Sequence, residues 1–349
     1  MRIIFFTDHF FPEISAPASH IYDRCKIWVK KGHNVTVVTN FPNYPSGKTY
    51  EGYKNVLRSN EVIEGIKVLR VGTYMTENSG GIKRSLDYLS YCFSSFLNSL
   101  TLPKPDIVIS TTPHIFIPLA GMVFSKIKGV PHVLEVRDLW PESIAANTSM
   151  SRESLLYKAL EKLEKLLYKQ SENIIVFTKS FKENIQSRGI DKEKLHVVIN
   201  GANLELFSDI KPQKAFATTN NLENKFIVSY MGTFGLSHNL SNAIEAARIV
   251  KSDDIHFLFL GDGAEKKKIK DLARRLGADN VHFFDPVQRK ELTKYWAITN
   301  VGLVHLKNDP AFSSVIPSKI FETMAVGVPI VYSGPVSDGS ELIKEHNSG

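Results

Sequence analysis

The chain has 349 residues, of which 43% are hydrophobic and 23% charged, and its formal net charge is +7. This length predicts two domains, and the composition excludes an intrinsically disordered chain. Only two cysteines occur, Cys25 and Cys92, without a C-x-x-C pair, so neither a disulfide framework nor a cysteine zinc site is expected. The positive charge favours phosphorylated substrates or anionic lipid head groups, whereas the chain lacks the basic blocks and motifs that nucleic-acid binding requires.

The sequence contains no apolar run of about 18 residues, so no membrane-spanning helix is expected. The N-terminal apolar run ends at Asp8, which is too early for a signal peptide. These features predict a cytoplasmic protein.

The first half of the chain alternates apolar strands with helical patterns. A strand over residues 2–7 is followed by the loop FFPEISAPAS, a helix over 19–31 that ends at Gly32, and a strand over 34–40. Further strands are expected over 66–71, 106–112, 132–136, 173–178 and 195–200, and a helix over 151–170. Continuously apolar strands separated by helices are typical of a parallel, doubly wound sheet.

The polar segment 208–224 contains Pro212 and shows no periodicity, which predicts a linker between domains. The strand–helix alternation then restarts, with strands over 225–232, 256–261, 280–284, 301–306 and 329–333. We therefore expect an N-terminal Rossmann-like domain over 1–207 and a second one over 225–349. In such α/β folds, ligands bind beyond the carboxyl ends of the strands, so two domains facing across a cleft would share a site there.

Two kinds of enzyme are disfavoured by missing motifs. The loop after the first strand has no glycine, and GDGAEK from Gly261 lacks the third glycine of the dinucleotide fingerprint, which argues against a nicotinamide cofactor. No Asp-x-Asp pair and no H-E-x-x-H pattern occurs, so we expect no metal and no cofactor.

The segment SSVIPSKIFETMAVGVPIVYS, residues 313–333, is the most informative one. Pro317 fits the first turn of a short helix, whose free N–H groups and dipole attract phosphate. Lys319 opposes the dipole, which a bound anion would explain, and Glu322 lies one turn after Ser318, where a carboxylate can bind ribose hydroxyls. A plain surface ion pair between Lys319 and Glu322 is the alternative.

These segments resemble the retaining glycosyltransferases of family 4, which share the GT-B fold of two Rossmann-like domains. The resemblance covers the whole chain and depends on six segments: FFPEISAPAS with the following KKGHNVTVVTNFPNYPSG, EVRDLWPES, VVINGANLELF, SYMGTFGLSHNL, FLGDGAEK and PSKIFETMAVGVP. Within the family, the chain is most similar to transferases that build bacterial capsule, O-antigen and colanic-acid-type polysaccharides, some of which are described as L-fucosamine transferases.

The resemblance implies a site for the nucleotide-sugar donor. Glu322 matches the second glutamate of the family's paired motif, which binds the ribose, while the first glutamate is replaced by Ser314. The family's diphosphate-binding Arg and Lys are replaced by Thr233 and, approximately, His238, so Lys319 and backbone N–H groups would take over that charge. The implied donor-binding residues are Gly232, Thr233, His238, Asp285, Pro286, Ser314, Pro317, Ser318, Lys319 and Glu322.

The resemblance also implies a catalytic centre and an acceptor loop in the N-terminal domain. Arg137 and Asp138 occupy the place where many relatives have a histidine near the anomeric carbon, so they are the expected catalytic residues. A salt bridge plus a turn is the alternative for these two residues. The loop near the acceptor would contain Pro12, Glu13, Ser15 and Ala16, of which the last two replace paired glycines.

Residues 81–104 carry an apolar helical face made of Leu86, Leu89, Phe93, Phe96, Leu97 and Leu100, with Lys83 and Arg84 at its start. Such a helix can lie on an anionic membrane surface, which would place the protein at the inner face of the plasma membrane, near a polyprenyl-linked acceptor. A helix packed into the core is the alternative.

Together, these features predict a metal-independent hexosyltransferase. It would move a sugar such as L-FucNAc with retention from a UDP-sugar to a saccharide or polyprenyl-diphosphate-linked acceptor, in lipopolysaccharide O-antigen or capsule synthesis. Catalysis would require charge stabilisation on the leaving phosphate rather than a protein nucleophile. Two alternatives stay open: a sugar-nucleotide epimerase of GT-B fold, and a non-catalytic GT-B-like partner subunit.

Overall fold

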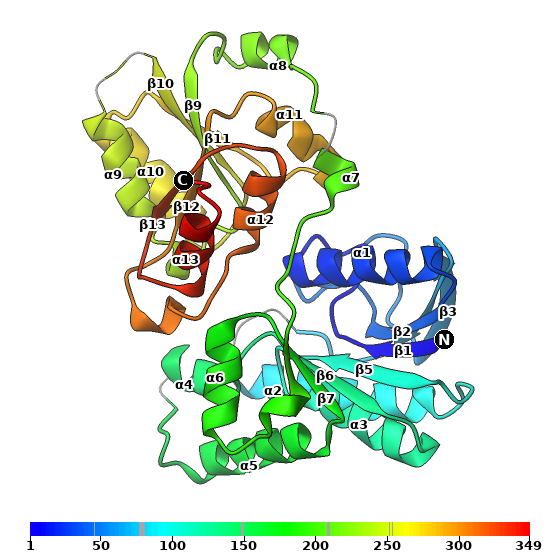
Figure 1. Ribbon diagram of the computed structural model, residues 1–349. Helices are drawn as coiled ribbons and strands as arrows, with labels where there is room; N and C mark the ends of the chain where they lie inside the picture. The colour runs from blue at the N-terminus through cyan, green and yellow to red at the C-terminus, as the bar shows by residue number, and fades with distance from the viewer. Residues whose placement is uncertain (45, 77–80, 148–149, 208–209, 251, 253) are drawn as a thin grey trace. The chain divides into compact units, whose positions relative to one another are not determined.

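The computed structural model describes residues 1–44, 46–76, 81–147, 150–207, 210–250, 252 and 254–349. Its contacts divide the chain into two compact units, Met1–Ile199 (unit 1) and Asn200–Gly349 (unit 2). Each unit is a mainly parallel sheet covered by helices, as Figure 1 shows. The predicted α/β class with two doubly wound sheets is confirmed.

Unit 1 contains an eight-stranded sheet in the order β3-β4-β2-β1-β5-β6-β7-β8, in which all neighbours are parallel except β3 and β4. Its strands are β1 (Arg2–Phe6), β2 (Asn34–Asn40), β3 (Arg58–Ile63), β4 (Ile66–Val71), β5 (Ile107–Thr111), β6 (His132–Val136), β7 (Asn173–Val176) and β8 (Leu195–Val197). Its helices are α1 (Ala16–Lys30), α2 (Gly81–Ser99), α3 (Phe116–Lys128), α4 (Glu142–Asn147), α5 (Leu155–Gln170) and α6 (Lys179–Ser187), with the 3-10 turn η1 (Lys192–Lys194).

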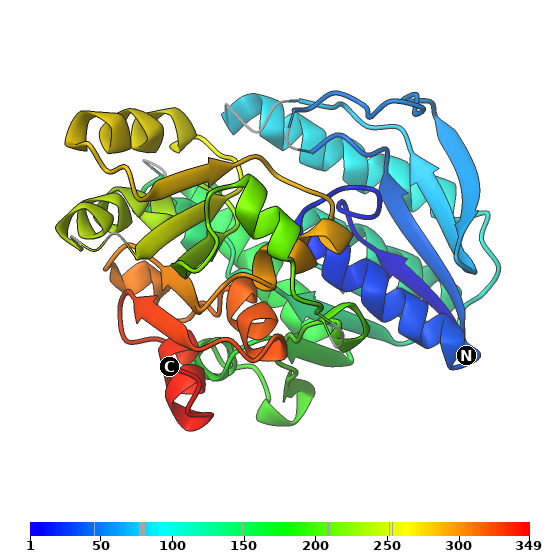
Figure 2. The ribbon, with the colours of Figure 1, turned by 90° about the horizontal axis from the view of Figure 1, so that it is seen from above.

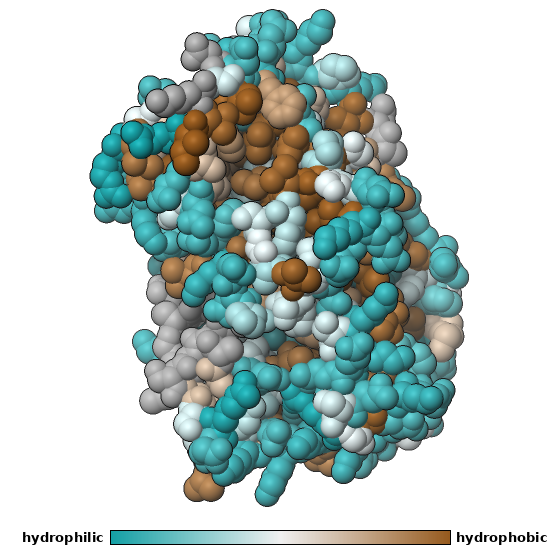
Figure 3. Space-filling model, turned by 60° about the vertical axis from the view of Figure 1, so that its left-hand side comes forward, coloured by the Kyte–Doolittle hydropathy of each residue, from teal (hydrophilic) through white to brown (hydrophobic). Residues whose placement is uncertain are grey.

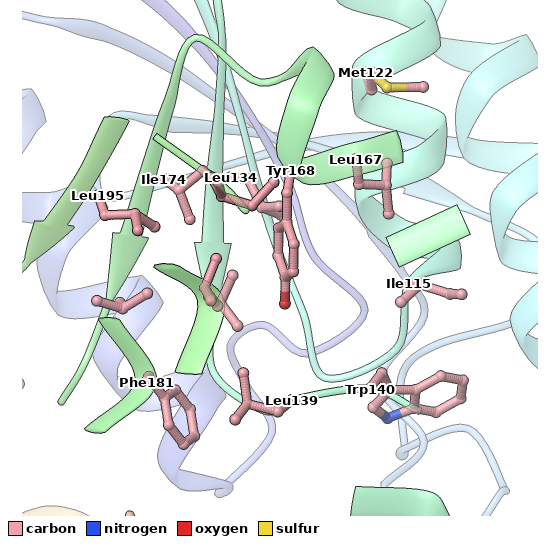
Figure 4. Close-up of a cluster of buried hydrophobic side chains, with 14 residues drawn as sticks. Ile115, Met122, Leu134, Leu139, Trp140, Leu167, Tyr168, Ile174, Phe181 and Leu195 are labelled. Atoms are coloured by element: carbon pink, nitrogen blue, oxygen red, sulfur yellow. The ribbon is translucent and has the colours of Figure 1, made fainter. Parts of the chain in front are cut away.

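The core of unit 1 is built from strands that are buried on both faces, as the continuous apolar patterns predict. Figure 4 shows the cluster between β6, β7 and the helices that cover them. Tyr168 of α5 lies within this cluster, and its hydroxyl donates to Glu164 at 2.7 Å, so its polar end is satisfied. This packed cluster supports β6 and β7 from below the loops at their carboxyl ends.

Two details of unit 1 differ from the sequence-based expectation. Helix α1 begins at Ala16 rather than near residue 19, because Ser15 caps it by accepting from the Ala18 N–H and Pro17 fits its first turn. Strand β3 was not expected, because its polar, half-exposed pattern lacks an apolar run. The two residues Glu64 and Gly65, both with positive φ, join it to β4 as a tight hairpin.

Unit 2 contains a five-stranded parallel sheet in the order β11-β10-β9-β12-β13. Its strands are β9 (Phe226–Met231), β10 (Ile255–Leu260), β11 (Val281–Phe284), β12 (Val301–His305) and β13 (Ile330–Ser333). Its helices are α7 (Leu204–Phe207), α8 (Lys214–Thr219), α9 (Leu240–Ile249), α10 (Lys266–Leu276), α11 (Leu292–Trp296), α12 (Ser318–Ala325) and α13 (Asp338–Glu345), with the 3-10 turns η2 (Leu236–His238), η3 (Arg289–Glu291) and η4 (Pro310–Phe312). Figures 1 and 2 show α9 and α10 side by side on one face of this sheet, while α12 and α13 pack against β12 and β13 on the other.

The boundary between the units lies between Ile199 and Asn200, earlier than the expected end of the first domain at residue 207. The described part of the segment 208–224, expected to be a linker, packs into unit 2 instead. It forms α8, and Phe216 packs edge-on against Tyr295 of α11 with ring centroids 4.9 Å apart. Phe207 and Leu222 are buried in the same cluster. Because the apolar side chains of this segment are not periodically spaced, the sequence pattern did not predict that the segment packs into unit 2.

The β13 edge of unit 2 is less completely covered than the centre of its sheet. Val331 pairs with Leu303, which faces α9 and α10, yet Val331 itself is 53% exposed. Figure 3 shows apolar side chains reaching the surface of unit 2 among polar ones. Among the described residues, no helix combines the length and apolar character that crossing a bilayer requires.

Candidate functional site

Each sheet has one place where neighbouring strands send their following connections to opposite sides, and ligands of doubly wound folds bind there. In unit 1 it lies between β1 and β5, and in unit 2 between β9 and β12. Most of the expected site residues lie in the loops after β1, β9 and β12 or in the helix α12 that follows the last of these loops. We describe the two sites separately, starting with unit 2.

In unit 2, glycines allow the loops after β9 and β10 to touch through their backbones. A Cβ atom on Gly261 would lie 1.9 Å from the carbonyl oxygen of Gly232, and both glycines have φ values, +150° and +144°, that other residues rarely adopt. The Gly232 N–H donates to Leu260, and the Phe234 N–H donates to Asp262. The GDG sequence therefore serves close packing of loops, and the loop after β9 runs directly beside α12.

The Lys319 ammonium group lies in this narrow space. Its Nζ is 3.6 Å from the ring centroid of Tyr230 and would be 3.3 Å from a Cβ atom on Gly232. Lys319 is only 8% exposed, and its Nζ has no hydrogen-bond partner. Burial lowers its pKa to about 7, against the opposing effect of the Glu322 carboxylate. A buried cation that has only an aromatic face as partner is incompletely compensated, and an anion would complete it.

The α12 N-terminus provides further donors beside this cation. Pro317 is the N-cap residue and has an extended conformation. The helix begins at Ser318, so Pro317 precedes the first turn in which the sequence pattern placed it. No side chain caps the helix, and its first turn holds no acidic residue. The helix therefore offers free N–H groups and the positive end of its dipole to an anion.

The remaining unit 2 residues surround this region at different depths. Glu322 is half-buried, and burial raises its pKa, while the charges of Arg289 and Lys319 oppose that rise. Burial and then the charge of Lys319 lower the pKa of His238 to about 4, so this side chain is neutral, and its Nδ1 lies 3.2 Å from the carbonyl oxygen of His305. His238 therefore cannot supply the positive charge of the residue that it replaces.

Four expected residues lie nearer to solvent. Thr233 and Pro286 are exposed, and Ser314 is half-buried in the loop between η4 and α12. Asp285, at the end of β11, is held by Lys266 at 2.7 Å, and this hydrogen bond lowers its pKa. Thr233 and Ser314 are thus shorter and uncharged where the resemblance implies larger, charged side chains.

In unit 1, buried charges cluster after β1 and β5. The His9 Nδ1 lies 2.7 Å from a Glu13 carboxylate oxygen, and the Asp8 carboxylate lies 3.7 Å from the His9 Nε2 and 3.4 Å from the His114 Nε2. The other Glu13 oxygen accepts from the Asn43 and Tyr44 N–H groups at 2.9 and 3.0 Å. Although burial opposes it, the charges of Asp8 and Glu13 raise the pKa of His9 to about 9, so it is a cation at neutral pH.

Except for Glu13, these residues line a cavity of about 240 Å³, closed on one side by α2. Its lining consists of Asp8, His9, Asn40, Asn43, Tyr44, Thr76, Arg84, Asp87, Tyr88, Tyr91, Pro113 and His114. The His114 ring stacks on Tyr88 with centroids 3.9 Å apart. Burial, and then the charge of Asp8, raise the pKa of Asp87 to about 7. Of the expected acceptor loop, Glu13 stabilises this cavity, Ser15 caps α1, Pro12 is half-buried and Ala16 is exposed.

The expected catalytic pair follows β6, outside the cavity lining. Arg137 donates through Nε to Thr111 at 2.9 Å, and its guanidinium lies 4.8 Å from the Phe177 ring centroid and 3.9 Å from Glu135. Burial lowers the pKa of Arg137 to about 10 and raises that of Asp138. The Asp138 N–H bonds Thr112. Arg137 therefore has structural partners within unit 1, as the salt-bridge alternative proposes.

Sequence reasoning missed Asp8, His9, Asp87 and His114 in unit 1, and Tyr230 in unit 2. A signal was available for three of them, since the pairs DH and PH come directly after two strands that the topology makes neighbours. Asp87 lay within a helix that was considered only for its apolar face. In the described part of the chain, no three His, Cys, Asp or Glu side chains are grouped as a metal site would need.

Comparison with known sequences gives matches to two family models. The glycosyl transferase 4-like domain matches residues 15–201, and the glycosyl transferases group 1 model matches residues 212–349. The colanic acid biosynthesis glycosyl transferase WcaI of Escherichia coli K12 is 25% identical over 94% of this chain and 82% of that protein. The glycosyltransferase WbjE of Pseudomonas aeruginosa is 24% identical over 70% of this chain and 62% of the relative.

Solved structures show the same fold at low sequence identity. WaaG, a glycosyltransferase involved in lipopolysaccharide biosynthesis, superimposes with a TM-score of 0.70 at 16% identity, over 99% of this chain and 84% of its own. Anabaena HepE, solved with UDP and glucose, has a TM-score of 0.63 at 14% identity, covering 99% and 89% of the two chains. These likenesses establish the fold.

Proposed function

This chain belongs to the glycosyl transferase 4-like family, and from that premise we propose that it transfers a sugar from a UDP-sugar donor to an acceptor in bacterial surface-polysaccharide synthesis. The observation that carries the proposal is the buried Lys319 ammonium group, whose Nζ has no hydrogen-bond partner. Relatives named for colanic acid and lipopolysaccharide biosynthesis support the biological setting.

The donor diphosphate would lie between the α12 N-terminus and the Lys319 Nζ. There it would receive backbone N–H bonds and a charge-assisted bond from a cation that is already desolvated. Glu322, one turn along α12, would bind the ribose hydroxyls, and the loop at Asp285 and Pro286 would contact the base. HepE has been solved with UDP, which supports uridine as the nucleoside.

As the bond between the donor sugar and the diphosphate breaks, negative charge develops on the phosphate that leaves as part of UDP. Lys319 and the α12 dipole would stabilise that charge, so the reaction would need no metal and no protein nucleophile. We propose transfer with retention, and L-FucNAc as one donor sugar among those to be tried. Arg137 and Asp138 would lie near the reacting centre through their position after β6, with Ser314 leaving space for the donor sugar.

Binding of UDP to the whole chain, measured by isothermal titration calorimetry, tests this function. Saturable binding, followed by release of UDP from one UDP-sugar of a panel only when acceptor is added, is the expected result. Conversion of the donor to a new sugar nucleotide without acceptor would favour the epimerase alternative. A chain that binds neither UDP nor any UDP-sugar would be the non-catalytic subunit, and the proposal would fail.

The surface of α2 supports a lipid-linked acceptor. Its apolar face is exposed in the structure: Phe93 is 65% and Leu97 59% exposed, and Leu86, Leu89 and Leu100 also face solvent. Phe96 packs into the core instead, so the expected face is correct except at that position. Lys83 and Arg84 are exposed at the start of the helix. We propose that this face lies on an anionic membrane at the cytoplasmic side, where apolar burial and charge attraction act together.

Replacing both Phe93 and Leu97 with Ser should abolish co-sedimentation with vesicles that contain anionic phospholipid. The wild-type chain should bind these vesicles, less so in high salt, because salt screens the basic side chains. Ile249→Ser removes an even more exposed apolar side chain from unit 2 and should change nothing. Equal binding to neutral vesicles, or none at all, contradicts the membrane proposal.

A further inference from the structure

The cavity of unit 1 contains carboxyl groups that can still accept hydrogen bonds from a ligand. Asp8 is 8% exposed, and one of its oxygens, Oδ1, has no hydrogen-bond partner although it is buried. Its other oxygen faces His9 and His114. A buried carboxylate oxygen without a donor is costly, so the Asp8 side chain provides a built acceptor for a ligand's N–H or O–H group.

A second carboxyl group, Asp87 of α2, lines the same cavity. Both carboxyl groups line one cavity, and burial together with the charge of Asp8 raises the pKa of Asp87, so the two groups repel each other when both are ionised. A hydrogen-bond donor placed between them would relieve this repulsion. His9 and Arg84 line the same cavity, but His9 is already engaged by Glu13 and Arg84 by the Tyr88 hydroxyl. Beside the two acids a hydrogen-bond donor is therefore favoured over a phosphate or a carboxylate, which would add negative charge there.

We propose that Asp8 and Asp87 together recognise the sugar that accepts the transferred residue, by taking hydrogen bonds from two of its hydroxyl groups or from an ammonium group on it. This inference rests on the proposed transferase function and adds the residues that select the acceptor. It assigns the unit 1 cavity to the acceptor and leaves the donor to unit 2.

The rest of the cavity suits one sugar ring. Its volume, about 240 Å³, is below the range of roughly 300–1,000 Å³ that holds drug-sized ligands. Asn40, Asn43 and Thr76 add neutral polar groups to its lining, and the stacked rings of Tyr88 and His114 give it an aromatic wall. The Tyr88 hydroxyl accepts from Arg84 at 2.6 Å, which fixes that ring at the cavity.

Asp87 is also the group that titrates within the cavity near neutral pH. The pKa values of its charged neighbours lie elsewhere, at about 2 for Asp8 and about 9 for His9, while burial lowers that of His114. The Arg84 guanidinium on α2 bonds the Tyr88 hydroxyl, and the Glu13 carboxylate is occupied by His9 and two backbone N–H groups. The carboxylate form of Asp87 is therefore gained as pH rises through about 7.

The test measures binding of methyl glycosides to the whole chain by saturation-transfer NMR, with UDP present. The panel holds methyl glycosides of hexoses, 2-amino-2-deoxyhexoses and N-acetylhexosamines at concentrations up to 100 mM. Asp87→Asn is the main variant, because it keeps the shape of a half-buried side chain. Asp8→Asn is the second variant, and Asp271→Asn, an exposed position on α10, is the matched control.

We expect one glycoside to bind the wild-type chain about tenfold or more tightly than either cavity variant, since a bond to a charged acceptor is lost. Its affinity should rise between pH 6 and 8 in the wild type and stay constant in Asp87→Asn. If an ammonium group is the donor, the aminohexoside binds the wild type best and loses this advantage in Asp87→Asn. If hydroxyl groups are the donors, Asp87→Asn lowers the affinity for all three classes of glycoside together.

Equal affinity in wild type and Asp87→Asn would overturn the inference, and so would the absence of binding by every glycoside to a chain that binds UDP. UDP affinity should be the same in all these variants, because the donor site lies in unit 2. A chain that binds a glycoside through Asp87 but binds no UDP would refute the proposed function and leave this cavity assignment intact.

Discussion

The two units place opposite, incomplete charges at equivalent points of their sheets. Beyond β9 and β12, unit 2 buries a cation, Lys319, with an aromatic ring but no anion against it. Beyond β1 and β5, unit 1 buries carboxylates that have cationic neighbours, yet Asp8 retains an oxygen without a donor. The unit 2 site therefore favours an anion, such as the diphosphate of a nucleotide. The unit 1 site favours hydrogen-bond donors, such as the hydroxyl groups of a sugar.

The loops that form these sites are also held in different ways. Unit 2 brings backbone against backbone, which requires glycine at positions 232 and 261. The loop after β1 in unit 1 has no glycine and is held by side chains. Glu13 accepts from two N–H groups of the loop after β2, and Arg70 donates to the Phe11 carbonyl oxygen at 2.6 Å. The following variants test both contrasts, beginning with the largest expected effect.

Gly261→Ala should destabilise unit 2 by about 3 kcal/mol or more, because the new Cβ atom would lie 1.9 Å from the Gly232 carbonyl oxygen and φ is strained as well. Urea unfolding followed by circular dichroism measures this, and UDP binding should be lost with it. Gly277→Ala, at a positive φ but with open space around it, should cost only about 1 kcal/mol. Equal effects of the two substitutions would contradict the backbone contact.

Lys319→Met should weaken UDP binding by about 10- to 150-fold, which corresponds to about 1.5–3 kcal/mol for a charge-assisted hydrogen bond. The same variant should raise the melting temperature of the ligand-free chain, because it removes a buried charge that has no anionic partner. Calorimetric titration and thermal unfolding provide the two readouts. Lys344→Met, an exposed position on α13, should leave both unchanged. Unaltered UDP affinity would remove Lys319 from the site.

Glu13→Ala should destabilise unit 1 by about 2 kcal/mol, because two backbone N–H groups and the His9 ring lose their acceptor. Glu183→Ala on the exposed side of α6 should stay within about 0.5 kcal/mol of wild type. UDP affinity should be retained at temperatures where the variant is folded, since Glu13 belongs to the other unit. A stability equal to that of the control would show that the loop after β1 is held by other contacts.

The smallest expected effect is uptake of a proton on UDP binding. With a pKa of about 7, Lys319 is mostly neutral at pH 8 in the free chain, and a bound phosphate raises that pKa. Up to one proton per UDP should be taken up, detectable as a dependence of calorimetric enthalpy on the buffer's ionisation enthalpy. Lys319→Met should show no such dependence, and a wild-type chain without uptake at pH 8 would contradict the lowered pKa.

The same lowered pKa has a consequence for stability in the absence of ligand. Between about pH 7 and the ordinary lysine pKa, the unfolded chain holds more protons than the folded one, so Lys319 makes the free energy of unfolding rise as pH increases through this window. Below pH 7 the penalty for its burial is fully present. This contribution should disappear in Lys319→Met.

Local patterns in the sequence determined the α/β class, the strand–helix alternation of two doubly wound sheets, and the α12 segment with Lys319 and Glu322. Strand runs and helix-ending glycines are read from neighbouring residues alone, because backbone preferences and periodicity act over a few positions. The exposed apolar face of α2 was likewise predictable from its spacing, except at Phe96.

Tertiary structure alone decided which loops meet and which charges are buried. Asp8 and His114 are about a hundred residues apart, and Asp87 comes from a helix between them, so only the sheet order brings their side chains to one cavity. The packing of Phe216 into unit 2 and the stacking of Tyr230 against Lys319 have the same origin. Burial and charge coupling depend on distance in space rather than along the chain, and single-sequence patterns contain no measure of that distance.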